Sequence, residues 1–454
     1  MKVGDKLQLT IEDFNTKGQG FARHEGMAIF IAGGLIGEEC QVEITTMKKQ
    51  YAIAKITETI HPSPNEVTPV CPLAGTCGGC QIQSLDYKAQ LAYKEQRVKS
   101  EFKRVGIEIE PLPIMGMEDP YHFRNKAQLP VSGKKGNLKL GFYKQGTHNV
   151  VDTQTCYIQH DLHNKVMKEL RTLLNNELVV PFNERNRKGW LKHVIVRVSF
   201  DQKKVMVMLV TTGRGDMDMY RFVSKLTKAV PEVTSIFQNI NGMSGNRILG
   251  KRFIHLFGQK ELVDTIGDLH FKISPASFFQ INPTQTEKLY NAALNMAELT
   301  GKERVYDLYC GSGTISLFLA KQAKEVIGIE IVEAAVKDAQ VNAIDNNINN
   351  ASFYAGKAEE VFPELYKEGR KAEVVIVDPP RKGLDPQVID TIADMKPQKI
   401  VYVSCNPNTL ARDVKALTEC GYTLNHVQPV DMFPHSMHVE TVAQLSRNCN
   451  DCSE

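Results

Sequence analysis

The sequence predicts a multidomain chain: a small β-barrel, then a mixed α+β region, then an α/β unit built on a parallel sheet. Three observations support this prediction. The length of 454 residues allows roughly three domains of about 150 residues each. Short segments that alternate polar and apolar residues fill the amino-terminal region. From about residue 268 onward, strands alternate with helical periods, which is typical of a parallel α/β sheet.

The amino-terminal region, residues 1–60, has the pattern of a small OB-like barrel. Its segments are "KLQLTI", "GMAIFIA", "ECQVEIT" and "YAIAKIT", separated by glycines. The proline-rich stretch "HPSPNEVTPVCP" closes this unit. The central region, residues 61–265, contains a helix expected from about Tyr87 to Arg104 and strands at "VIVRVSF" and "VMVMLVTT".

The carboxyl-terminal region, residues 266–454, is predicted to be Rossmann-like. Its strands are "RVYDLYC", "EVIGIE", "AEVVIVD" and "KIVYVSC", with helical periods between them. Two further strands, "YTLNHVQPV" and "HVETVAQL", follow in quick succession, and this spacing predicts an antiparallel hairpin at the end of the sheet.

Composition limits the class of protein. The hydrophobic content of 42% is normal for a globular chain. No apolar run reaches the roughly 18 residues of a membrane helix, and the amino terminus lacks the apolar core of a signal peptide, so we expect a cytoplasmic protein without membrane association. In that compartment, ten cysteines indicate metal binding or catalysis rather than disulfides.

Two stretches without acidic residues suggest a partner. The net charge of +3 is uninformative, but residues 121–151 and 185–200 contain no Asp or Glu and many Lys and Arg, and aromatic residues are interleaved in the first. Cations for phosphates and rings for splayed bases are what single-stranded RNA binding requires. An ordinary solvated surface is the competing interpretation.

The segment "VYDLYCGSGTISLFLA" predicts a strand, a glycine turn and a helix start, where a ligand approaches the backbone. The next strand ends at Glu330, which can accept both hydroxyls of a ribose. A dinucleotide is the alternative ligand, but Ser316 replaces the third glycine of that fingerprint and Asp307 lies on the preceding strand. These details favour S-adenosylmethionine. Cys310, within the loop, is interpreted as a small packed residue.

A candidate catalytic group forms at the same sheet edge. Asp378 opens "DPPRKGL" at the end of one strand, and Cys405 ends the next, just before Asn-Pro-Asn. Carboxyl ends of parallel strands share one edge of the sheet, which faces the ligand crevice. The predicted terminal hairpin returns Glu440 to this edge. A thiol, two carboxylates and a cofactor pocket therefore converge.

The cluster "CPLAGTCGGCQIQ" predicts a metal centre. It provides Cys71, Cys77 and Cys80, and Cys156 is the best candidate for a fourth ligand. Four thiolates suit either zinc or an iron–sulfur cluster, and spacing alone leaves both open. Cys449 and Cys452 also have C-x2-C spacing, but no second pair lies nearby.

Nearly the whole chain resembles the bacterial 23S ribosomal RNA (uracil-C5)-methyltransferases. The resemblance rests on "CPLAGTCGGCQIQ", "YHFRNKAQLPV", "SFFQIN", "DLYCGSGT", "DPPRKGL", "SCNP" and "HVETV". It implies a TRAM-type barrel, a central domain with an iron–sulfur cluster and a class I methyltransferase domain. It also implies 23S ribosomal RNA as the partner. We expect a monomer, although no sequence feature bears on the oligomeric state.

The resemblance assigns roles to individual residues. Cys405 would be the nucleophile and Glu440 the general base. S-adenosylmethionine would bind Gln280, Tyr309, Glu330 and Asp378, and a [4Fe–4S] cluster would bind Cys71, Cys77, Cys80 and Cys156. Thr314 stands where some relatives have Asn and is given no contact.

The chemistry explains why a thiol is needed. C5 of uracil attacks a methyl sulfonium only after a thiolate has added at C6, so we expect the site to favour the thiolate. A carboxylate then removes the C5 proton. The target nucleotide must be flipped into the pocket, where Phe278 or Phe279 could stack on it.

Three other functions compete. A transfer-RNA uracil-C5 methyltransferase has the same chemistry, but the dedicated bacterial enzymes, by resemblance, lack the barrel and the cysteine cluster. A non-catalytic RNA-binding protein would not need the pair Cys405 and Glu440. A DNA cytosine methyltransferase normally places its nucleophile after proline in the earlier motif, where this chain has Asp378-Pro-Pro.

Overall fold

The computed structural model describes residues 1–215 and 217–448; the Cys449 and Cys452 pair lies outside the described residues. The chain divides into two compact units. The first comprises residues 1–93, 141–157 and 433–437, and the second comprises residues 94–140, 158–432 and 438–454. Each is described by itself below.

The first unit contains a six-stranded sheet in the order β1-β5-β6-β4-β3-β2. The strands are β1 (Lys6–Thr10), β2 (Asp13–Phe14), β3 (Gly20–His24), β4 (Met27–Ala32), β5 (Glu39–Met47) and β6 (Tyr51–His61). Alternate residues of these strands point inward, as the sequence pattern predicts, and Ile29, Ile31 and Ile44 are fully buried in the core. The four predicted strands are β1, β4, β5 and β6; β2 and β3 were not predicted separately.

Helix α1 (Tyr87–Arg104) has the predicted bounds. Its second half belongs to the second unit, where Val98 and Phe102 are fully buried.

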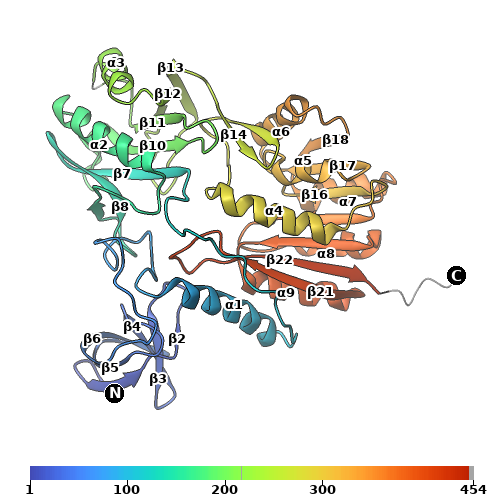
Figure 1. The fold of residues 1–454 in the computed structure, drawn as a ribbon, viewed down its shortest axis with the longest axis horizontal. Coiled ribbons are helices and arrows are strands. Elements are labelled where there is room, and N and C mark those ends of the chain that lie inside the picture. Colours follow the sequence, from blue (N-terminus) through green and yellow to red (C-terminus); the bar gives the residue numbers. More distant parts are fainter. Residues whose placement is uncertain (216, 449–454) are drawn as a thin grey trace. The chain divides into compact units, whose positions relative to one another are not determined.

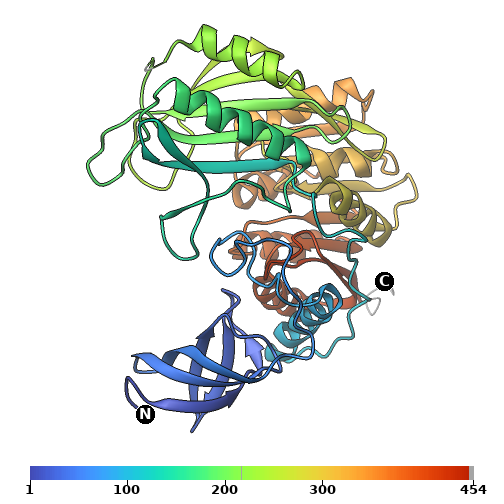
Figure 2. The ribbon, with the colours of Figure 1, turned by 60° about the vertical axis from the view of Figure 1, so that its left-hand side comes forward.

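The central sheet has the strand order β13-β12-β11-β10-β7-β8-β9. The strands are β7 (Lys126–Lys134), β8 (Asn137–Tyr143), β9 (Val150–Asp152), β10 (Leu191–Val198), β11 (Val205–Thr211), β12 (Val233–Ile240) and β13 (Arg252–Gly258). Helices α2 (Asp161–Asn176) and α3 (Met219–Ala229) lie on one face of this sheet (Figure 2). A short ribbon, β14 (Leu262–Ile266) with β15 (Leu269–Ile273), follows.

The carboxyl-terminal sheet has the order β18-β17-β16-β19-β20-β22-β21. Its strands are β16 (Arg304–Leu308), β17 (Glu325–Glu330), β18 (Ala351–Ala355), β19 (Val374–Val377), β20 (Lys399–Ser404), β21 (Tyr422–Val430) and β22 (Glu440–Arg447). The first five are parallel to one another, whereas β22 pairs antiparallel with both β20 and β21, so the predicted terminal hairpin is confirmed.

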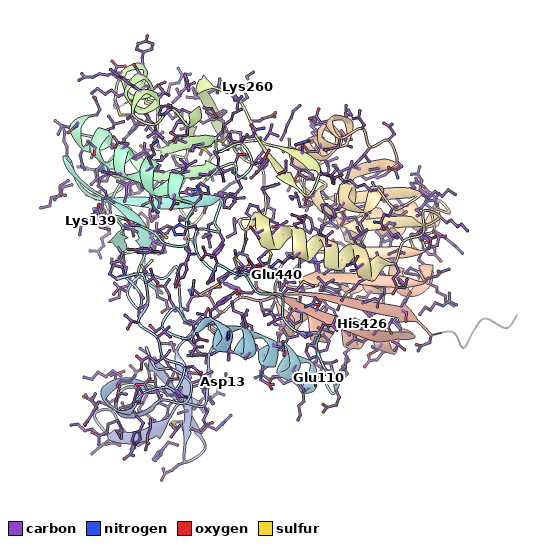
Figure 3. The ribbon with its side chains drawn as sticks, in the orientation of Figure 1. Asp13, Glu110, Lys139, Lys260, His426 and Glu440 are labelled. Atoms are coloured by element: carbon purple, nitrogen blue, oxygen red, sulfur yellow. The ribbon has the colours of Figure 1, made fainter. Side chains whose placement is uncertain are left out.

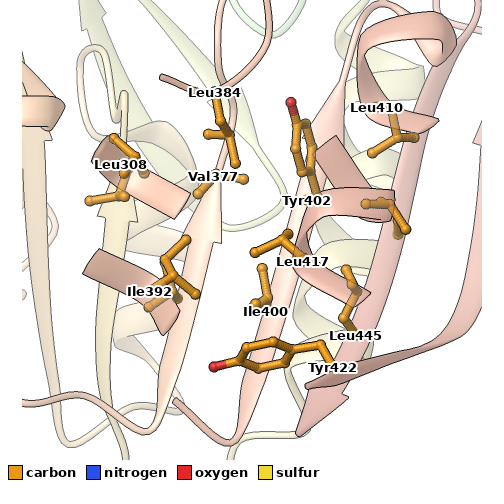
Figure 4. Packing of buried hydrophobic residues seen from close by; sticks show 14 of the residues in the cluster. Leu308, Val377, Leu384, Ile392, Ile400, Tyr402, Leu410, Leu417, Tyr422 and Leu445 are labelled. Atoms are coloured by element: carbon orange, nitrogen blue, oxygen red, sulfur yellow. The ribbon is translucent and has the colours of Figure 1, made fainter. Parts of the chain in front are cut away.

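Helices cover both faces of this sheet. They are α4 (Pro283–Ala297), α5 (Thr314–Ala320), α6 (Glu333–Asp345), α7 (Ala358–Lys367), α8 (Pro386–Met395) and α9 (Pro407–Glu419). Side chains of α7, α8 and α9 form one continuous core with Leu308, Val377, Ile400 and Tyr402 (Figure 4). Burial of apolar surface contributes roughly 25 cal/mol of stability per Å² removed from water. This packing stabilises the sheet and so keeps the carboxyl ends of its strands in register. Of the helices that the structure describes, none is long and apolar enough to cross a membrane.

Candidate functional site

Strand register brings the predicted thiol and carboxylate together. In the β20–β22 pair, Ser404 lies opposite Thr441, so Cys405 and Glu440 are the next residues at the same edge. Glu440 is buried and Cys405 is half-buried (Figure 3 labels Glu440). Asn406 and Pro407 start α9 immediately after the thiol, and the Asn406 side chain caps that helix. The sequence thus stops β20 and begins α9 around the reactive residue.

Burial beside two carboxylates opposes the thiolate form of Cys405, contrary to the expectation from the sequence. Burial, Glu440 and Asp378 raise the pKa of Cys405 to about 11, and Arg381 opposes them. Burial and Asp378 also raise the pKa of Glu440 to about 8, again opposed by Arg381. The physical reason is that two carboxylates and a thiol share one poorly solvated edge, where each negative charge disfavours the others.

The "DPPRKGL" loop is fixed beside Cys405. Asn406 and Thr409, at the start of α9, donate side-chain hydrogen bonds to the Arg381 carbonyl at 3.2 and 3.4 Å. Gly383 has a φ of +82°, and a Cβ there would lie 2.4 Å from Asp413 Oδ2. The glycine is therefore required for the turn that places Arg381 near the thiol.

The glycine loop after β16 has the backbone that its sequence predicts. Gly311 and Gly313 have φ values of +56° and +78°, and Gly313 precedes the first residue of α5. Glu330 is held rigidly, because its carboxylate accepts hydrogen bonds from the Gly311 and Val332 amides at 3.1 and 2.8 Å. The next residue, Ile331, is 61% exposed. An oriented carboxylate beside an exposed apolar side chain suits a ribose with a flat base attached.

Three further predicted residues differ in their placement. Cys310 is buried, as interpreted from the sequence. Asp307 is fully buried; burial raises its pKa to about 7, and its Oδ1 has no hydrogen-bond partner among the described residues. The Tyr309 ring packs against the hydrophobic core, where burial together with Glu359 and Asp385 raises its pKa to about 12. Only the Tyr309 backbone, with a φ of +70°, belongs to the glycine loop.

The segment "SFFQIN", residues 277–282, is clamped to the central sheet. The Asn125 side chain donates to the Gln280 carbonyl at 2.9 Å, and Arg197 donates to the Ser277 carbonyl at 2.9 Å. Arg197 is 3% exposed, and its Nη1 has no partner among the described residues. The two phenylalanines of this segment differ in exposure: Phe279 is buried against Phe271, whereas Phe278 is 71% exposed.

The four predicted metal ligands all lie in the first unit. Cys71, Cys77, Cys80 and Cys156 are half-buried and free of disulfides. The Gly79 amide donates to Cys77 Sγ at 3.4 Å, and the Gln83 side chain lies 3.9 Å from Cys80 Sγ. N–H donors to sulfur suit a thiolate ligand. Across the described ranges, however, no three candidate ligands are grouped closely enough to define a metal site.

Comparison with known proteins decides the family. Residues 86–448 match the family described as tRNA (Uracil-5-)-methyltransferase, and residues 1–57 match the TRAM domain. The chain belongs to the tRNA (uracil-5-)-methyltransferase family.

Similar proteins support this methyltransferase assignment over the full length. An uncharacterized RNA methyltransferase of Clostridium tetani is 44% identical and is aligned over 98% of this chain and 97% of its own. One from Halalkalibacterium halodurans is 43% identical, with 97% of each chain covered. The crystal structure of Pyrococcus abyssi tRNA (uracil-54, C5)-methyltransferase with S-adenosyl-L-homocysteine has a TM-score of 0.79 at 28% identity, covering 97% of this chain and 100% of that one.

The family membership confirms the coarser predictions. The chain is an S-adenosylmethionine-dependent RNA methyltransferase with an amino-terminal TRAM domain and a class I methyltransferase fold. The iron–sulfur cluster, the choice of RNA and the residue roles stay predictions.

Two residues of this methyltransferase site were missed. Arg381 is exposed, and its positive charge lowers the pKa of both Cys405 and Glu440. His438 lies two residues before Glu440 and is exposed; partial desolvation and the nearby cations Arg381 and Arg97 lower its pKa. A signal existed for Arg381, which follows Asp378-Pro-Pro directly. For His438 the signal was its alternation with Glu440 in "HVETV".

Proposed function

We propose that this protein methylates C5 of a uridine in 23S ribosomal RNA. The observation that carries methylation at C5 is the β20–β22 register, which sets Cys405 beside Glu440 at the edge where the glycine loop also ends. The choice of 23S RNA is supported by the resemblance of the sequence motifs. Both residues are needed for methylation at C5, because a nucleophile must add at C6 and a base must later remove the C5 proton.

In the proposed mechanism, Cys405 Sγ bonds to C6 and the electrons of the C5–C6 double bond move toward O4. C5 then attacks the methyl group that S-adenosylmethionine would supply; the bond from that methyl to sulfur breaks, its electron pair stays on sulfur, and S-adenosylhomocysteine leaves. Glu440 then removes the C5 proton, the C5–C6 double bond forms again, and the bond from sulfur to C6 breaks to release the thiolate. Phe278, the exposed ring of its pair, would stack on the flipped uracil.

The cofactor pocket is proposed around Glu330, with Gln280, Asp378 and the Tyr309 backbone. Asp307 Oδ1, which has no hydrogen-bond partner in the described part of the chain, and the exposed Ile331 fit a ligand that carries a cation and a flat ring. These features support S-adenosylmethionine at this edge.

Transfer RNA is the second candidate substrate, because the Pyrococcus abyssi relative is, by its title, a tRNA (uracil-54, C5)-methyltransferase and is matched over 97% of this chain. That coverage includes the barrel, so the barrel does not by itself distinguish the two substrates. Methylated uridines should be mapped in ribosomal and transfer RNA from cells with and without this protein. Loss of a methyl group from 23S RNA supports the proposal, and loss only from transfer RNA overturns it.

Glu330→Ala should weaken cofactor binding. Hydrogen bonds to a charged acceptor contribute ~1.5–3 kcal/mol, so we expect the S-adenosylmethionine affinity to fall roughly ten- to a hundredfold, as measured by calorimetry. Glu333→Ala is the matched control, since Glu333 is an exposed acid in the next helix. An unchanged affinity of Glu330→Ala would contradict the proposed pocket.

Activity should rise with pH, because the protonated forms of Glu440 and Cys405 are both unreactive. With a Glu440 pKa of about 8 and a Cys405 pKa of about 11, kcat/KM should still be rising above pH 8. Arg381→Gln removes the cation that lowers both pKa values, so its profile should shift to higher pH. Because both groups must lose a proton, a rise of about one unit in each pKa would reduce activity at pH 7 roughly a hundredfold. Lys382→Gln, at the neighbouring exposed position, should leave the profile unchanged.

We also propose that Cys71, Cys77, Cys80 and Cys156 hold a [4Fe–4S] cluster. All four belong to one compact unit, and backbone bonds such as Gly78 N to Tyr143 O, at 2.9 Å, join the segments that carry them. Such a cluster would tie these segments together as a cross-link does.

Anaerobically purified protein should therefore be brown and contain iron and sulfide. Cys77→Ser should bleach it and lower its melting temperature, whereas Cys420→Ser, at an exposed cysteine in the second unit, should do neither. Colourless wild-type protein with one zinc ion per chain would rule out the cluster.

A further inference from the structure

Three loops of the second unit meet at one edge of the central sheet. Loop 182–190 leads into β10, loop 212–218 leaves β11, and loop 241–251 leaves β12. Leu191 pairs with Thr211, and Thr211 pairs with Ile240, so all three loops lie at the same edge. We call the described residues of these loops, together with Tyr220, the distal loop surface.

Buried polar side chains hold the loops in place. Trp190 Nε1 donates to the Gly213 carbonyl at 2.9 Å, and Gln238 donates to the same carbonyl at 3.0 Å. Lys192 Nζ donates to the Met243 carbonyl at 3.0 Å and lies 5.0 Å from the centre of the Phe182 ring. These bonds tie each loop to the strands beneath it.

The third loop is also bound to itself. Asn241, 2% exposed, donates to the carbonyls of Arg247 and Ile248 at 2.7 and 2.8 Å. Burying polar groups is unfavourable unless they are hydrogen-bonded, and here the bonds are made to backbone that the loops present to solvent. A scaffold of this kind fixes the shape of an outer surface rather than filling a core.

Cations dominate what the loops expose. The exposed cations are Arg185, Arg187, Lys188, Arg214, Arg247 and Lys251. The acids among the described residues of the loops are Glu184 and Asp218, and Asp218 is used as the cap of α3. Beside them Tyr220 is 86% exposed and Met243 is 58% exposed. Guanidinium groups with an exposed ring match a phosphate backbone and an unstacked base.

The distal loop surface is separate from the candidate active site. Strand β10 connects them: Leu191 begins at the loops, and Arg197 binds the "SFFQIN" segment near the other end. Six residues of extended strand span ~20 Å at about 3.3 Å per residue. A single strand with only one or two nucleotides on either side of a uridine bound at Cys405 would not reach the loops.

We propose that the distal loop surface binds the backbone of the RNA substrate at a second place, so that the substrate is a folded RNA gripped well beyond its target loop. This inference rests on the proposed function. The grip is electrostatic, through Arg187, Arg214 and Arg247, and it is supplemented by stacking on Tyr220.

The test compares two RNAs that carry the same target uridine: a long folded transcript, and an oligonucleotide of about five residues with the uridine at its centre. The charge-reversal variant Arg187→Glu/Arg214→Glu/Arg247→Glu should lower kcat/KM on the long RNA at least tenfold and leave the short RNA within twofold. The slope of log affinity against log salt on the long RNA should fall by about 2 to 3, at roughly 0.7–0.9 for each lost phosphate contact. Tyr220→Ala should weaken the binding of the long RNA by about five- to a hundredfold and leave the binding of the short RNA unchanged.

The control is Lys302→Glu/Lys367→Glu/Lys371→Glu, which reverses three exposed charges near the opposite, amino edge of the carboxyl-terminal sheet. It should leave both RNAs unaffected. Equal losses on the two RNAs for the charge-reversal variant, or no loss on the long one, overturns the proposal. If wild type methylates neither RNA, the proposed function fails. The salt dependence of long-RNA binding, compared between wild type and the charge-reversal variant, still shows whether the distal loop surface binds RNA.

Discussion

Cys405→Ala is expected to abolish methylation while leaving the binding of RNA and S-adenosylmethionine within about twofold of wild type. Loss of a nucleophile removes the covalent route itself, so the fall in kcat should be on the order of 10⁴-fold or more. The thiol is half-buried just after β20. Among the described residues, its sulfur makes no hydrogen bond that stabilises β20 or the capped helix α9, so the fold should tolerate alanine.

The experiment measures transfer of labelled methyl to RNA, with binding followed separately by filter retention and calorimetry. Cys420→Ala is the matched control, because Cys420 is an exposed thiol at the carboxyl end of α9, the end of that helix away from Cys405. Residual turnover above one per cent in Cys405→Ala would contradict the assignment of the nucleophile.

Glu440→Gln is expected to trap the reaction part-way. The thiol can still add to C6 and the methyl group can still be transferred, but removal of the C5 proton is slowed because the amide is no base. A covalent protein–RNA adduct that contains the new methyl group should therefore accumulate and survive denaturation. The size and polarity of glutamine are close to those of the buried glutamic acid, so the β20–β22 register should persist.

The adduct is detected on a denaturing gel, with one label on the RNA and a second label on the methyl group of the donor. Wild type should form a similar adduct with 5-fluorouridine RNA, since fluorine does not leave as a proton does. The covalent adduct should disappear when Cys405→Ala is added to Glu440→Gln, and also when Cys405→Ala replaces wild type in the 5-fluorouridine experiment. An adduct that persists without Cys405 would identify another thiol as the nucleophile.

Local signals predicted much of this fold. Apolar periodicity fixed the bounds of α1, and the alternation of strands with helices predicted the parallel order that aligns Glu330, Asp378 and Cys405 at one edge. The quick succession of the last two strands predicted that Glu440 returns to Cys405, which the register bears out. Strand β18 was missed, because "ASFYA" is too short and too mixed to stand out.

What could not be predicted depends on neighbours distant in sequence. The pKa of Cys405 is raised by burial and by the charges of Glu440 and Asp378. No local pattern in the sequence records either the burial or these neighbours. Tyr309 combines a φ of +70° with a ring that packs against the core, and no local pattern in the sequence records this combination. The clamp on "SFFQIN" joins Arg197 and Ser277, eighty residues apart in the chain.

One feature of the first unit bears on how the protein is made. Residues 433–437 belong to that unit: the His435 carbonyl accepts hydrogen bonds from the Gln81 and Ile82 amides, and Gln90 contacts the His435 ring at 3.2 Å. The ribosome therefore completes the barrel-containing unit only after it has made most of the chain. At about 5–20 residues per second, the segment around Gln81 waits on the order of twenty seconds to a minute for its last partner. The unit that is first in sequence is thus among the last to close, and nascent chains should stay sensitive to protease near Gln81 until His435 emerges.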